Sequence, residues 1–181
     1  MAMAAVRPAT PADAPALARV HVRCWQQAYE GLLPPEVLGR HTPASREVQW
    51  RAELAQLGQG SCALQVFVAE AGGEVVGFSS SGAPRQEPAA PGEGEVRGLY
   101  LDEAQHGTGA GQLLLRAALE ALFEQGVAVA SLCVLEANAR ARAFYEKCGL
   151  RQAGAPVAPV VEGKYAVAVV RYTLAAADFT R

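Results

Sequence analysis

Three glycines stand at alternate positions in the segment His106-Gly107-Thr108-Gly109-Ala110-Gly111, directly before a helical pattern that starts at Gln112. Glycine lets the backbone turn sharply and expose successive N–H groups. At a helix N-terminus, such N–H groups and the helix dipole together form a site for phosphate or pyrophosphate. A tight strand-to-helix turn that binds no ligand fits the same residues, so the loop by itself leaves both interpretations open.

The spacing around this loop excludes the commonest nucleotide-binding motifs. A P-loop needs GxxxxGK[ST], but neither this spacing nor a lysine follows Gly109. A dinucleotide fingerprint needs Gly or Ala where Gln112 stands. GxSxG and HExxH are both missing, which argues against a serine hydrolase and a zinc protease. Scattered cysteines without CxxC pairs predict no metal site and reduced, mostly buried thiols at Cys24, Cys62, Cys133 and Cys148.

The elements that must position the loop follow from hydrophobic periodicity. After a short extended opening over 6–11, with Asp13 as a helix cap, we expect helices over 14–30, 42–57, 112–125 and 138–148. Strands are predicted over 62–70, 75–81, 95–102 and 127–135. The last strand is nearly continuously apolar, which is typical of a strand covered on both faces. Residues 157–161 and 165–174 are predicted to complete the sheet as a second hairpin, and 82–94 is predicted to be a surface loop.

Length and charge narrow the class of protein. The 181 residues suit a single domain over 1–181, and 51% hydrophobic residues exclude intrinsic disorder. Sixteen Lys plus Arg against 18 Asp plus Glu give a net charge of −2, which argues against a nucleic-acid partner or an anionic membrane surface. No apolar run is long enough to cross a bilayer, and the N-terminus lacks the pattern of a signal peptide. We therefore expect a cytoplasmic protein.

Four segments, taken in order, resemble the GCN5-related N-acetyltransferase (GNAT) family. That family's acetyl-CoA loop is Gln or Arg, two variable residues, Gly, one variable residue, then Gly or Ala, and this chain departs from it only at His106. The other three similar segments are His21–Pro34, Glu95–Leu101, and the pair Val134–Asn138 with Ala143–Leu150. The resemblance implies an α/β (α+β) fold with a mixed, mostly antiparallel central sheet of six to seven strands and about four flanking helices.

The resemblance also implies an acetyl-CoA-dependent N-acetyltransferase that moves an acetyl group directly to an amine in a ternary complex, with acetyl-CoA as co-substrate and no metal. A bulge in the fourth strand, near Leu99–Leu101, is implied to supply the oxyanion donor. An uncharged His106 could donate one hydrogen bond to pyrophosphate, and a protonated one would add charge attraction. The implied cofactor-binding residues are Leu99, Tyr100, Leu101, His106, Gly107, Thr108, Gly109, Ala110, Gly111, Gln112 and Asn138. A non-catalytic acyl-CoA sensor or interaction module on the same fold is the alternative.

The catalytic groups are hypotheses from the same resemblance. Tyr145 is the candidate acid, because a phenol with a pKa near 10 is protonated at neutral pH and can give its proton to a thiolate. It is expected at the edge of an inner helical stripe that includes Phe144. Glu95 is the leading candidate base, with Glu30 and His21 as alternatives. Each of these residues has an ordinary structural role as its competing explanation.

Partners follow from the same reading of the residues. Trp25 and Tyr29 lie four positions apart on the first helix and are candidates for the acceptor site, where aromatic rings bind amines, although core packing is the safer interpretation. The acceptor is expected to be a small-molecule amine or a protein or peptide amine. The few lysines and the absence of a basic cluster favour an amine over an anion. By resemblance, a homodimer through the C-terminal strands is implied.

Overall fold

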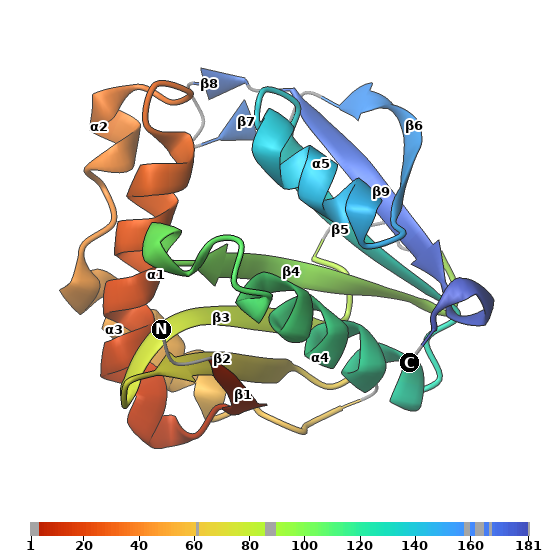
Figure 1. The fold of residues 1–181 in the computed structure, drawn as a ribbon, viewed down its shortest axis with the longest axis horizontal. Coiled ribbons are helices and arrows are strands. Elements are labelled where there is room, and N and C mark those ends of the chain that lie inside the picture. The colour runs from red at the N-terminus through yellow and green to blue at the C-terminus, as the bar shows by residue number, and fades with distance from the viewer. Residues whose placement is uncertain are drawn as a thin grey trace.

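One seven-stranded sheet, with helices on both faces, forms the centre of the protein (Figure 1). The computed structural model describes residues 4–60, 62–85, 90–157, 160–161, 165–166 and 168–180. The strand order is β1-β2-β3-β4-β5-β9-β6, and β7 pairs with β8 in a separate two-stranded sheet. Every neighbouring pair is antiparallel except β4 and β5. The expected mixed, mostly antiparallel sheet of six to seven strands is confirmed.

The elements have the following bounds. The α-helices within the described residues are α1 (Ala14–Tyr29), α2 (Pro35–Leu38), α3 (Pro43–Leu54), α4 (Ala110–Glu124) and α5 (Ala139–Lys147). The strands there are β1 (Ala5–Pro8), β2 (Gln65–Ala71), β3 (Glu74–Gly82), β4 (Glu93–Leu101), β5 (Val129–Leu135), β6 (Arg151–Val157), β7 (Val160–Val161), β8 (Tyr165–Ala166) and β9 (Val169–Ala175). No helix in these parts of the chain is both long enough and apolar enough to cross a membrane.

The starts of α3 and α1 differ, since the first has a local side-chain cap and the second does not. Thr42 caps α3, since its hydroxyl accepts a hydrogen bond from the Ser45 N–H at 3.2 Å. Asp13 precedes α1 as expected, but its side chain makes no capping bond to that helix. Its carboxylate accepts instead from the Thr10 N–H at 2.7 Å and from the Arg7 guanidinium at 2.8 Å. The short α2 was not expected, and α3 ends three residues before the predicted 57.

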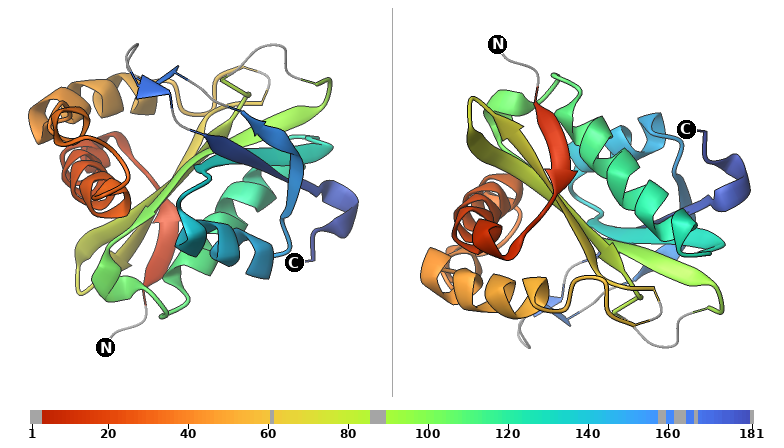
Figure 2. Two further views of the ribbon diagram at one scale, coloured as in Figure 1. Left: turned by 90° about the horizontal axis from the view of Figure 1, so that it is seen from above. Right: turned by 90° about the horizontal axis from the view of Figure 1, so that it is seen from below.

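The two faces of the sheet have different covers. Figure 2 shows α1 and α3 on one side of the sheet and α4 and α5 on the other. The first face packs apolar residues of α1, including the expected stripe residues Leu17 and Val20, against Val68 and Phe78 of the sheet. The second face packs α4 against β4, β5 and β9. Each face of the sheet therefore packs against helices through a hydrophobic layer.

The C-terminal strands differ from the predicted second hairpin. The main sheet receives β6 and β9, whereas the residues between them that the structure describes form the small β7–β8 pair. Strand β6 was missed because Gly154, with a φ of +75°, and Pro156 interrupt its alternation. Its register with β9 shifts between Ala153 and Val157. Parts of both predicted strands, at 158–159 and at 167, lie outside the described residues.

The expectation of a fifth strand covered on both faces is wrong at its C-terminal end. Ala130, Leu132 and Val134 of β5 are buried against the α4 face, but Cys133 between them is exposed. All four cysteines are free thiols, and only Cys24 is fully buried, so the prediction of mostly buried thiols is also wrong. For Cys133 the physical reason is a gap in the sheet: β4 and β5 separate, and Cys133 lines the cavity between them.

Candidate active site

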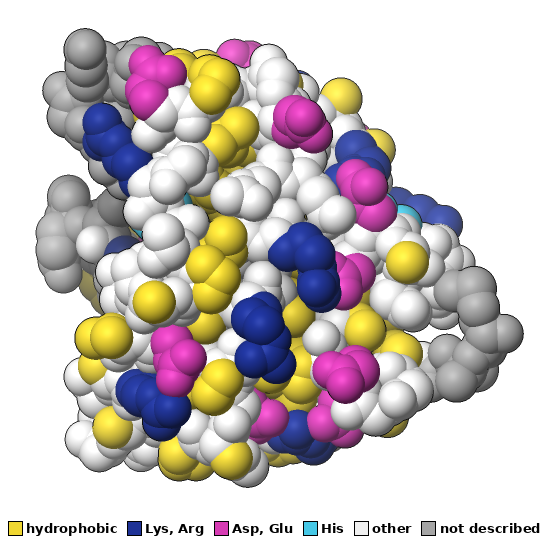
Figure 3. All heavy atoms as spheres, turned by 90° about the vertical axis from the view of Figure 1, so that its left-hand side faces the viewer, with side chains coloured by type: hydrophobic (Ala, Val, Ile, Leu, Met, Phe, Trp, Pro, Cys, Tyr) yellow, Lys and Arg dark blue, Asp and Glu magenta, His cyan; other side chains and the backbone are white. Residues whose placement is uncertain are grey.

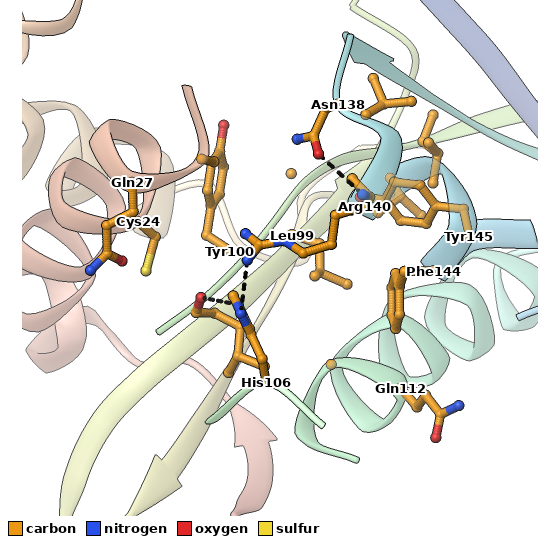
Figure 4. Close-up of a pocket in the computed structure, with 18 of the residues that line it drawn as sticks. Cys24, Gln27, Leu99, Tyr100, His106, Gln112, Asn138, Arg140, Phe144 and Tyr145 are labelled. Carbon is orange, nitrogen blue, oxygen red and sulfur yellow. Dashed lines mark hydrogen bonds between the residues drawn. The ribbon is translucent and has the colours of Figure 1, made fainter. Parts of the chain in front are cut away.

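A cavity of about 450 Å³ occupies the opening between β4 and β5. The two strands pair only over Glu93–Glu95 and Val129–Ser131, and beyond these residues they diverge. Four further elements reach the cavity: α1, the segment before α4, α4 itself and α5. Figure 4 shows side chains from these elements converging on the opening. The parting of one parallel strand pair therefore creates a site that opens to both faces of the sheet.

The register of β4 leaves part of its backbone facing this gap. The Asp102 N–H donates to the Val76 carbonyl at 2.9 Å, and Tyr100 is in the same phase of the antiparallel ladder with β3. Because successive residues of a strand direct their N–H and C=O groups to opposite sides, Leu99 and Leu101 direct theirs toward β5. Strand β5 has already diverged there. The Leu99 N–H is thus a donor aimed into the cavity.

A bulge in β4 sets this phase. Gly98 pairs with Ser80 and Val96 pairs with Ser81, so Arg97 is an extra residue on β4. As a result, Val96 and Leu99 pack on the same α4 face although three positions separate them. The bulge lies just before the last four residues of the strand rather than within the last three, where the resemblance placed it.

The glycine loop ends at the start of α4, as predicted. Gly107 and Gly109 have φ values of +78° and +92°, a conformation that strains any residue with a Cβ. The first helical hydrogen bond runs from the Leu113 N–H to the Gly109 carbonyl at 3.1 Å. The N–H groups of residues 110–112 therefore have no helical acceptor. That of Ala110 donates to the Thr108 hydroxyl at 3.4 Å, which leaves those of Gly111 and Gln112 facing the region before the helix. This arrangement, with the helix dipole, favours an anion.

The rest of the loop is held from within. The Thr108 hydroxyl donates to the Gln105 carbonyl at 2.8 Å, and Ala110 is buried against the sheet. Neither residue lines the cavity, and both N–H groups have acceptors within the loop: the Thr108 N–H donates to the Gln105 carbonyl at 3.3 Å, and the Ala110 N–H donates to the Thr108 hydroxyl at 3.4 Å. Thr108 and Ala110 therefore shape the loop. Across the opening, Asn138 caps α5 by accepting from the Ala141 N–H at 3.1 Å, and it also lines the cavity. The capping and cavity roles expected of Asn138 are thus compatible.

Tyr145 is more deeply placed than the sequence pattern suggested. It is the buried residue of α5, with 8% of its surface exposed, whereas Phe144 is half-buried against Gly111. Ala141, Phe144 and Cys148 of the predicted stripe pack against the core as expected, and Tyr145 lies deeper beside them, with its ring centroid 6.2 Å from that of Tyr172 on β9. Burial, followed by the nearby Tyr29 phenol, raises the pKa of Tyr145. The phenol lines the cavity in its protonated form.

The α1 side of the cavity is aromatic. Tyr29 lines the cavity, and its hydroxyl contacts that of Tyr100, whose side chain turns away from α4. Burial raises the pKa of both phenols, and the contact raises that of Tyr100 further. Trp25 lies behind Tyr29, with ring centroids 5.4 Å apart, and contacts His41 at 5.0 Å. Of the two predicted acceptor residues, Tyr29 lines the cavity and Trp25 supports it.

His21 is enclosed by three aromatic rings rather than placed at the cavity. Its ring centroid lies 5.7, 5.2 and 4.9 Å from those of Trp50, Phe78 and Tyr100. Burial, and then the charge of Arg46, lowers the pKa of His21 to about 3. Within the described residues its buried Nδ1 has no hydrogen-bond partner. Such a histidine is a weak base, so its placement does not favour a role in removing the acceptor's proton.

The candidate base Glu95 lies outside the described lining of the cavity. Its carboxylate accepts from the Arg85 N–H at 2.7 Å and from the Arg85 guanidinium at 2.9 Å. It acts electrostatically on Cys133, which does line the cavity. Glu30 is exposed at the end of α1. In this geometry, Glu95 does not directly contact an amine bound in the cavity.

The cavity thiols are not activated. Burial raises the pKa of Cys24 to about 12, and its Sγ donates to Asp102 Oδ1 at 3.4 Å. Burial, followed by the charge of Glu95, also raises the pKa of Cys133. A nucleophilic cysteine needs the opposite shift. Among the described residues, no group of three or more His, Cys, Asp or Glu side chains is placed to hold a metal ion.

With the geometry in view, the comparison with known proteins identifies the family. Residues 25–150 match the model of the Acetyltransferase (GNAT) family. The chain belongs to this family. It is 31% identical over 137 residues to YuaI, an uncharacterized N-acetyltransferase of Bacillus subtilis, covering 75% of this chain and 74% of that protein. It is 31% identical over 144 residues to Rv2775, a probable N-acetyltransferase of Mycobacterium tuberculosis, covering 78% and 76%. As a GNAT protein, the chain is an acyltransferase.

Solved structures agree on the fold. PaiA N-acetyltransferase of Thermoplasma acidophilum, determined in complex with coenzyme A, superposes with a TM-score of 0.72 at 19% identity, covering 94% of this chain and 98% of the other. The putative acetyltransferase YncA of Salmonella typhimurium, with its cofactor acetyl-CoA, gives 0.73 at 19% identity, covering 99% and 98%. At these identities the likeness concerns the fold.

Within this GNAT fold, the structure brings most of the predicted residues together and adds others. Those that line the cavity are Leu99, Tyr100, Leu101, His106, Gly107, Gly109, Gly111, Gln112, Asn138, Tyr145 and Tyr29. The additional charged or polar lining residues include Gln27, Arg97, Glu103, Cys133, Arg140 and Lys147. The spacing of Arg140, two positions after the predicted cap Asn138, was the one signal that could have indicated a charge at the start of α5.

Proposed function

We propose that this chain is an acetyl-CoA-dependent N-acetyltransferase that transfers the acetyl group directly to an amine in a ternary complex. The observation that carries the proposal is the meeting, in one cavity, of three chemical elements: the N–H groups at the start of α4, the unpaired Leu99 backbone and the Tyr145 phenol. Two structural neighbours, solved with coenzyme A and acetyl-CoA, support acetyl-CoA as the co-substrate.

The residues present fit this co-substrate. The loop offers the pyrophosphate the backbone N–H groups of its cavity-lining residues Gly107, Gly109, Gly111 and Gln112, together with a helix dipole. The backbone of Leu99 and Leu101 faces the gap where β5 has diverged, so it can pair with the amide-containing arm as a neighbouring strand would. Asn138 lines the opposite wall of the cavity, where its side chain can contact the same arm. The thioester end then lies toward Tyr145 and the α1 side.

In the proposed reaction, the acetyl group passes from the thioester sulfur to the amine nitrogen. The amine nitrogen forms a bond to the thioester carbon, the carbonyl oxygen gains negative charge, and the carbon–sulfur bond breaks. The Leu99 N–H is the donor available to the developing oxyanion. The departing thiolate takes a proton, and the amine gives one up, so amide and free thiol are the products. Tyr145, held protonated by burial, first stabilises the thiolate by a hydrogen bond and then relays the proton.

Direct transfer is favoured over an acetyl-cysteine intermediate. Cys24 and Cys133 are the described cavity thiols, and the pKa of each is raised rather than lowered. Their thiolate populations at neutral pH are therefore small, and the thiolate is the nucleophilic form. The amine reaches the thioester itself.

The acceptor enters from the α1 face, in this proposal. The Tyr29 ring and hydroxyl are placed to contact an amine, and the acceptor class stays broad: a small-molecule amine, or a protein or peptide amine. Because an alkylammonium has a pKa of about 10.4, a base must assist at neutral pH. Glu95 can serve through intervening water, since its carboxylate lies at the end of the cavity near Cys133.

A panel of amines incubated with acetyl-CoA, with free thiol release as the readout, tests the proposal. Wild type should release thiol with at least one amine and should be stabilised thermally by acetyl-CoA. Tyr145→Phe should retain acetyl-CoA binding while turnover falls about 100-fold or more. The matched control is Tyr172→Phe, which removes a buried phenol that donates to Glu146 at 2.6 Å outside the cavity.

Two outcomes would contradict the proposal. Folded wild-type protein that shows neither a thermal shift with acetyl-CoA nor thiol release with any amine rejects it. A thermal shift without turnover across the whole panel, unchanged by Tyr145→Phe, supports the alternative of an acyl-CoA sensor on this fold.

A further inference from the structure

His106 stands where the GNAT loop pattern has Gln or Arg, and the structure holds its ring from two sides. Nε2 lies 3.1 Å from the Leu101 carbonyl oxygen, and Nδ1 lies 3.2 Å from Nη1 of Arg140. Arg140 is the second residue of α5, and Figure 4 shows its side chain extending across the opening to the His106 ring. Two elements on opposite sides of the cavity are thereby joined through one imidazole.

These two contacts define the hydrogen-bonding state of the ring. A guanidinium group only donates hydrogen bonds, so Nδ1 must accept and must carry no proton. The single ring proton of a neutral imidazole then lies on Nε2, which donates to the Leu101 carbonyl. A protonated ring would oppose a donor to the donor of Arg140. His106 in this arrangement is therefore uncharged and does not supply the positive charge that arginine brings to the same loop position.

We propose that Arg140 supplies this charge to the cofactor pyrophosphate and that His106 is the positioning residue that aims it. The inference rests on the proposed function. Gly111 and Gln112 at the start of α4 line the same cavity as Arg140, together with Gly107 and Gly109, and the Arg140 guanidinium contacts His106 of the loop. A guanidinium beside exposed N–H groups is a strong combination for a diphosphate, because it adds a bidentate, permanently charged donor.

Glu103 lies beside the Arg140 guanidinium. Its Oε1 lies 3.9 Å from Nη1 of Arg140, both side chains are more than half exposed, and Glu103 also lines the cavity. At this distance and exposure, an ion pair contributes little. A diphosphate carries more charge and offers more acceptors, so Arg140 exchanges Glu103 for the cofactor. Glu103 is then a weak competitor for Arg140 and also repels the incoming anion.

The first test measures the dissociation constant of acetyl-CoA, by calorimetry, for single and double variants. Arg140→Ala should weaken binding about 10- to 100-fold, the range expected for a charged hydrogen-bonding group. His106→Phe keeps the ring volume but removes both hydrogen bonds and should weaken binding several-fold. The double variant should bind no more weakly than Arg140→Ala alone, because His106 acts through Arg140. Additive losses would overturn the positioning role.

The second test asks whether the hydrogen bonds, rather than the ring, carry the effect. His106→Gln restores one donor and one acceptor, which are the two functions that Leu101 and Arg140 need. We expect His106→Gln to recover wild-type affinity within about two-fold, while His106→Phe does not. Equal losses in both variants would refute the assigned role of the imidazole. Glu103→Gln should tighten binding about two- to five-fold, and a loss of affinity would contradict its role as a competitor.

The third test locates the phosphate and separates this inference from the proposed function. Dephospho-acetyl-CoA retains the pyrophosphate and should show the same Arg140→Ala loss as acetyl-CoA. S-acetylpantetheine lacks the pyrophosphate and should show none. A loss that disappears with dephospho-acetyl-CoA assigns Arg140 to the 3′-phosphate and overturns the proposal as stated. Arg116→Ala, at a similarly exposed arginine of α4 paired with Glu120, is the charge-matched control and should bind as wild type.

Wild-type protein that fails to bind acetyl-CoA at all rejects the proposed function together with this inference. Wild-type binding that Arg140→Ala leaves unchanged rejects the inference and leaves the proposed function standing.

Discussion

Acidification from pH 7 to pH 5 should destabilise the folded protein mainly through His21. Its ring is enclosed by aromatic side chains, and burial lowers its pKa from 6.5 to about 3. Below pH 6.5 the unfolded chain therefore binds a proton that the folded protein excludes, so stability falls as the pH falls and continues to fall until about pH 3. Applying the linkage relation to these two values, the loss between pH 7 and pH 5 is about 2 kcal/mol.

Asp13, a carboxyl group with a strongly lowered pKa, contributes little to the change in stability between pH 7 and pH 5. The Arg7 guanidinium, through its hydrogen bonds, lowers the pKa of Asp13 from 3.8 to about 2. A depressed carboxyl pKa contributes stability that is present above pH 4 and is lost only as the pH falls from 4 toward 2. The Arg7–Asp13 pair thus leaves the interval from pH 7 to pH 5 almost unaffected.

Urea unfolding at pH 7 and pH 5, for wild type and His21→Leu, measures the effect. Leucine has a volume similar to that of histidine, suits the aromatic surroundings because it is apolar, and does not titrate. We expect the free energy of unfolding of wild type to drop by about 2 kcal/mol and that of His21→Leu to drop by less than about a quarter of this amount. Equal drops in both proteins would refute the assignment of the pH dependence to His21. A direct titration that places its pKa near 6.5 would do the same.

Three further substitutions test the site. Gly109→Val places a Cβ at a φ of +92°, so the free energy of unfolding should fall by about 1 to 2 kcal/mol and calorimetry should detect no acetyl-CoA binding; unchanged tight binding would mean that the pyrophosphate lies elsewhere. Gly77→Ala brings a Cβ within 2.6 Å of the Leu101 Cδ1 and 2.8 Å of the Tyr100 backbone carbonyl oxygen, so chemical denaturation should show a loss of roughly 1 to 3 kcal/mol. A neutral result would show that β3 and β4 are less tightly packed. Cys133→Ala should keep thiol release within about three-fold of wild type, and mass spectrometry should find no acetylated enzyme; a complete loss of release would point to a covalent route.

The loop and the secondary structure around it were predictable because they depend on local rules. Short apolar runs, alternating over 62–70 and nearly continuous over 127–135, identified the four strands between 62 and 135, and the three-to-four periodicity identified α1, α3, α4 and α5. The turn at Gly107 and Gly109, before α4, was equally predictable, because glycine is the residue that adopts a positive φ without strain. The errors lie where local signals were weak: β6, interrupted by Gly154 and Pro156, and the four-residue α2.

The roles of individual side chains depended on contacts between distant parts of the chain. Helical spacing placed Tyr145 near a buried stripe, but its packing against β9 determined how deeply it is buried. Position along β4 suggested Glu95 as a base, but Arg85 pairs with its carboxylate. The His106 departure from the GNAT pattern was visible in the sequence. Its partner Arg140, 34 residues away, was not.

The sequence by itself determined most of the elements and their order, the glycine loop and the family, because each follows from short-range patterns of residue type. Only the tertiary structure decided where the site opens and what faces it. The parting of β4 and β5, and the extra residue Arg97 on β4, direct the Leu99 N–H into the gap. Strand pairing is a relation between segments far apart in the chain, and a one-residue shift reverses which groups face the cavity.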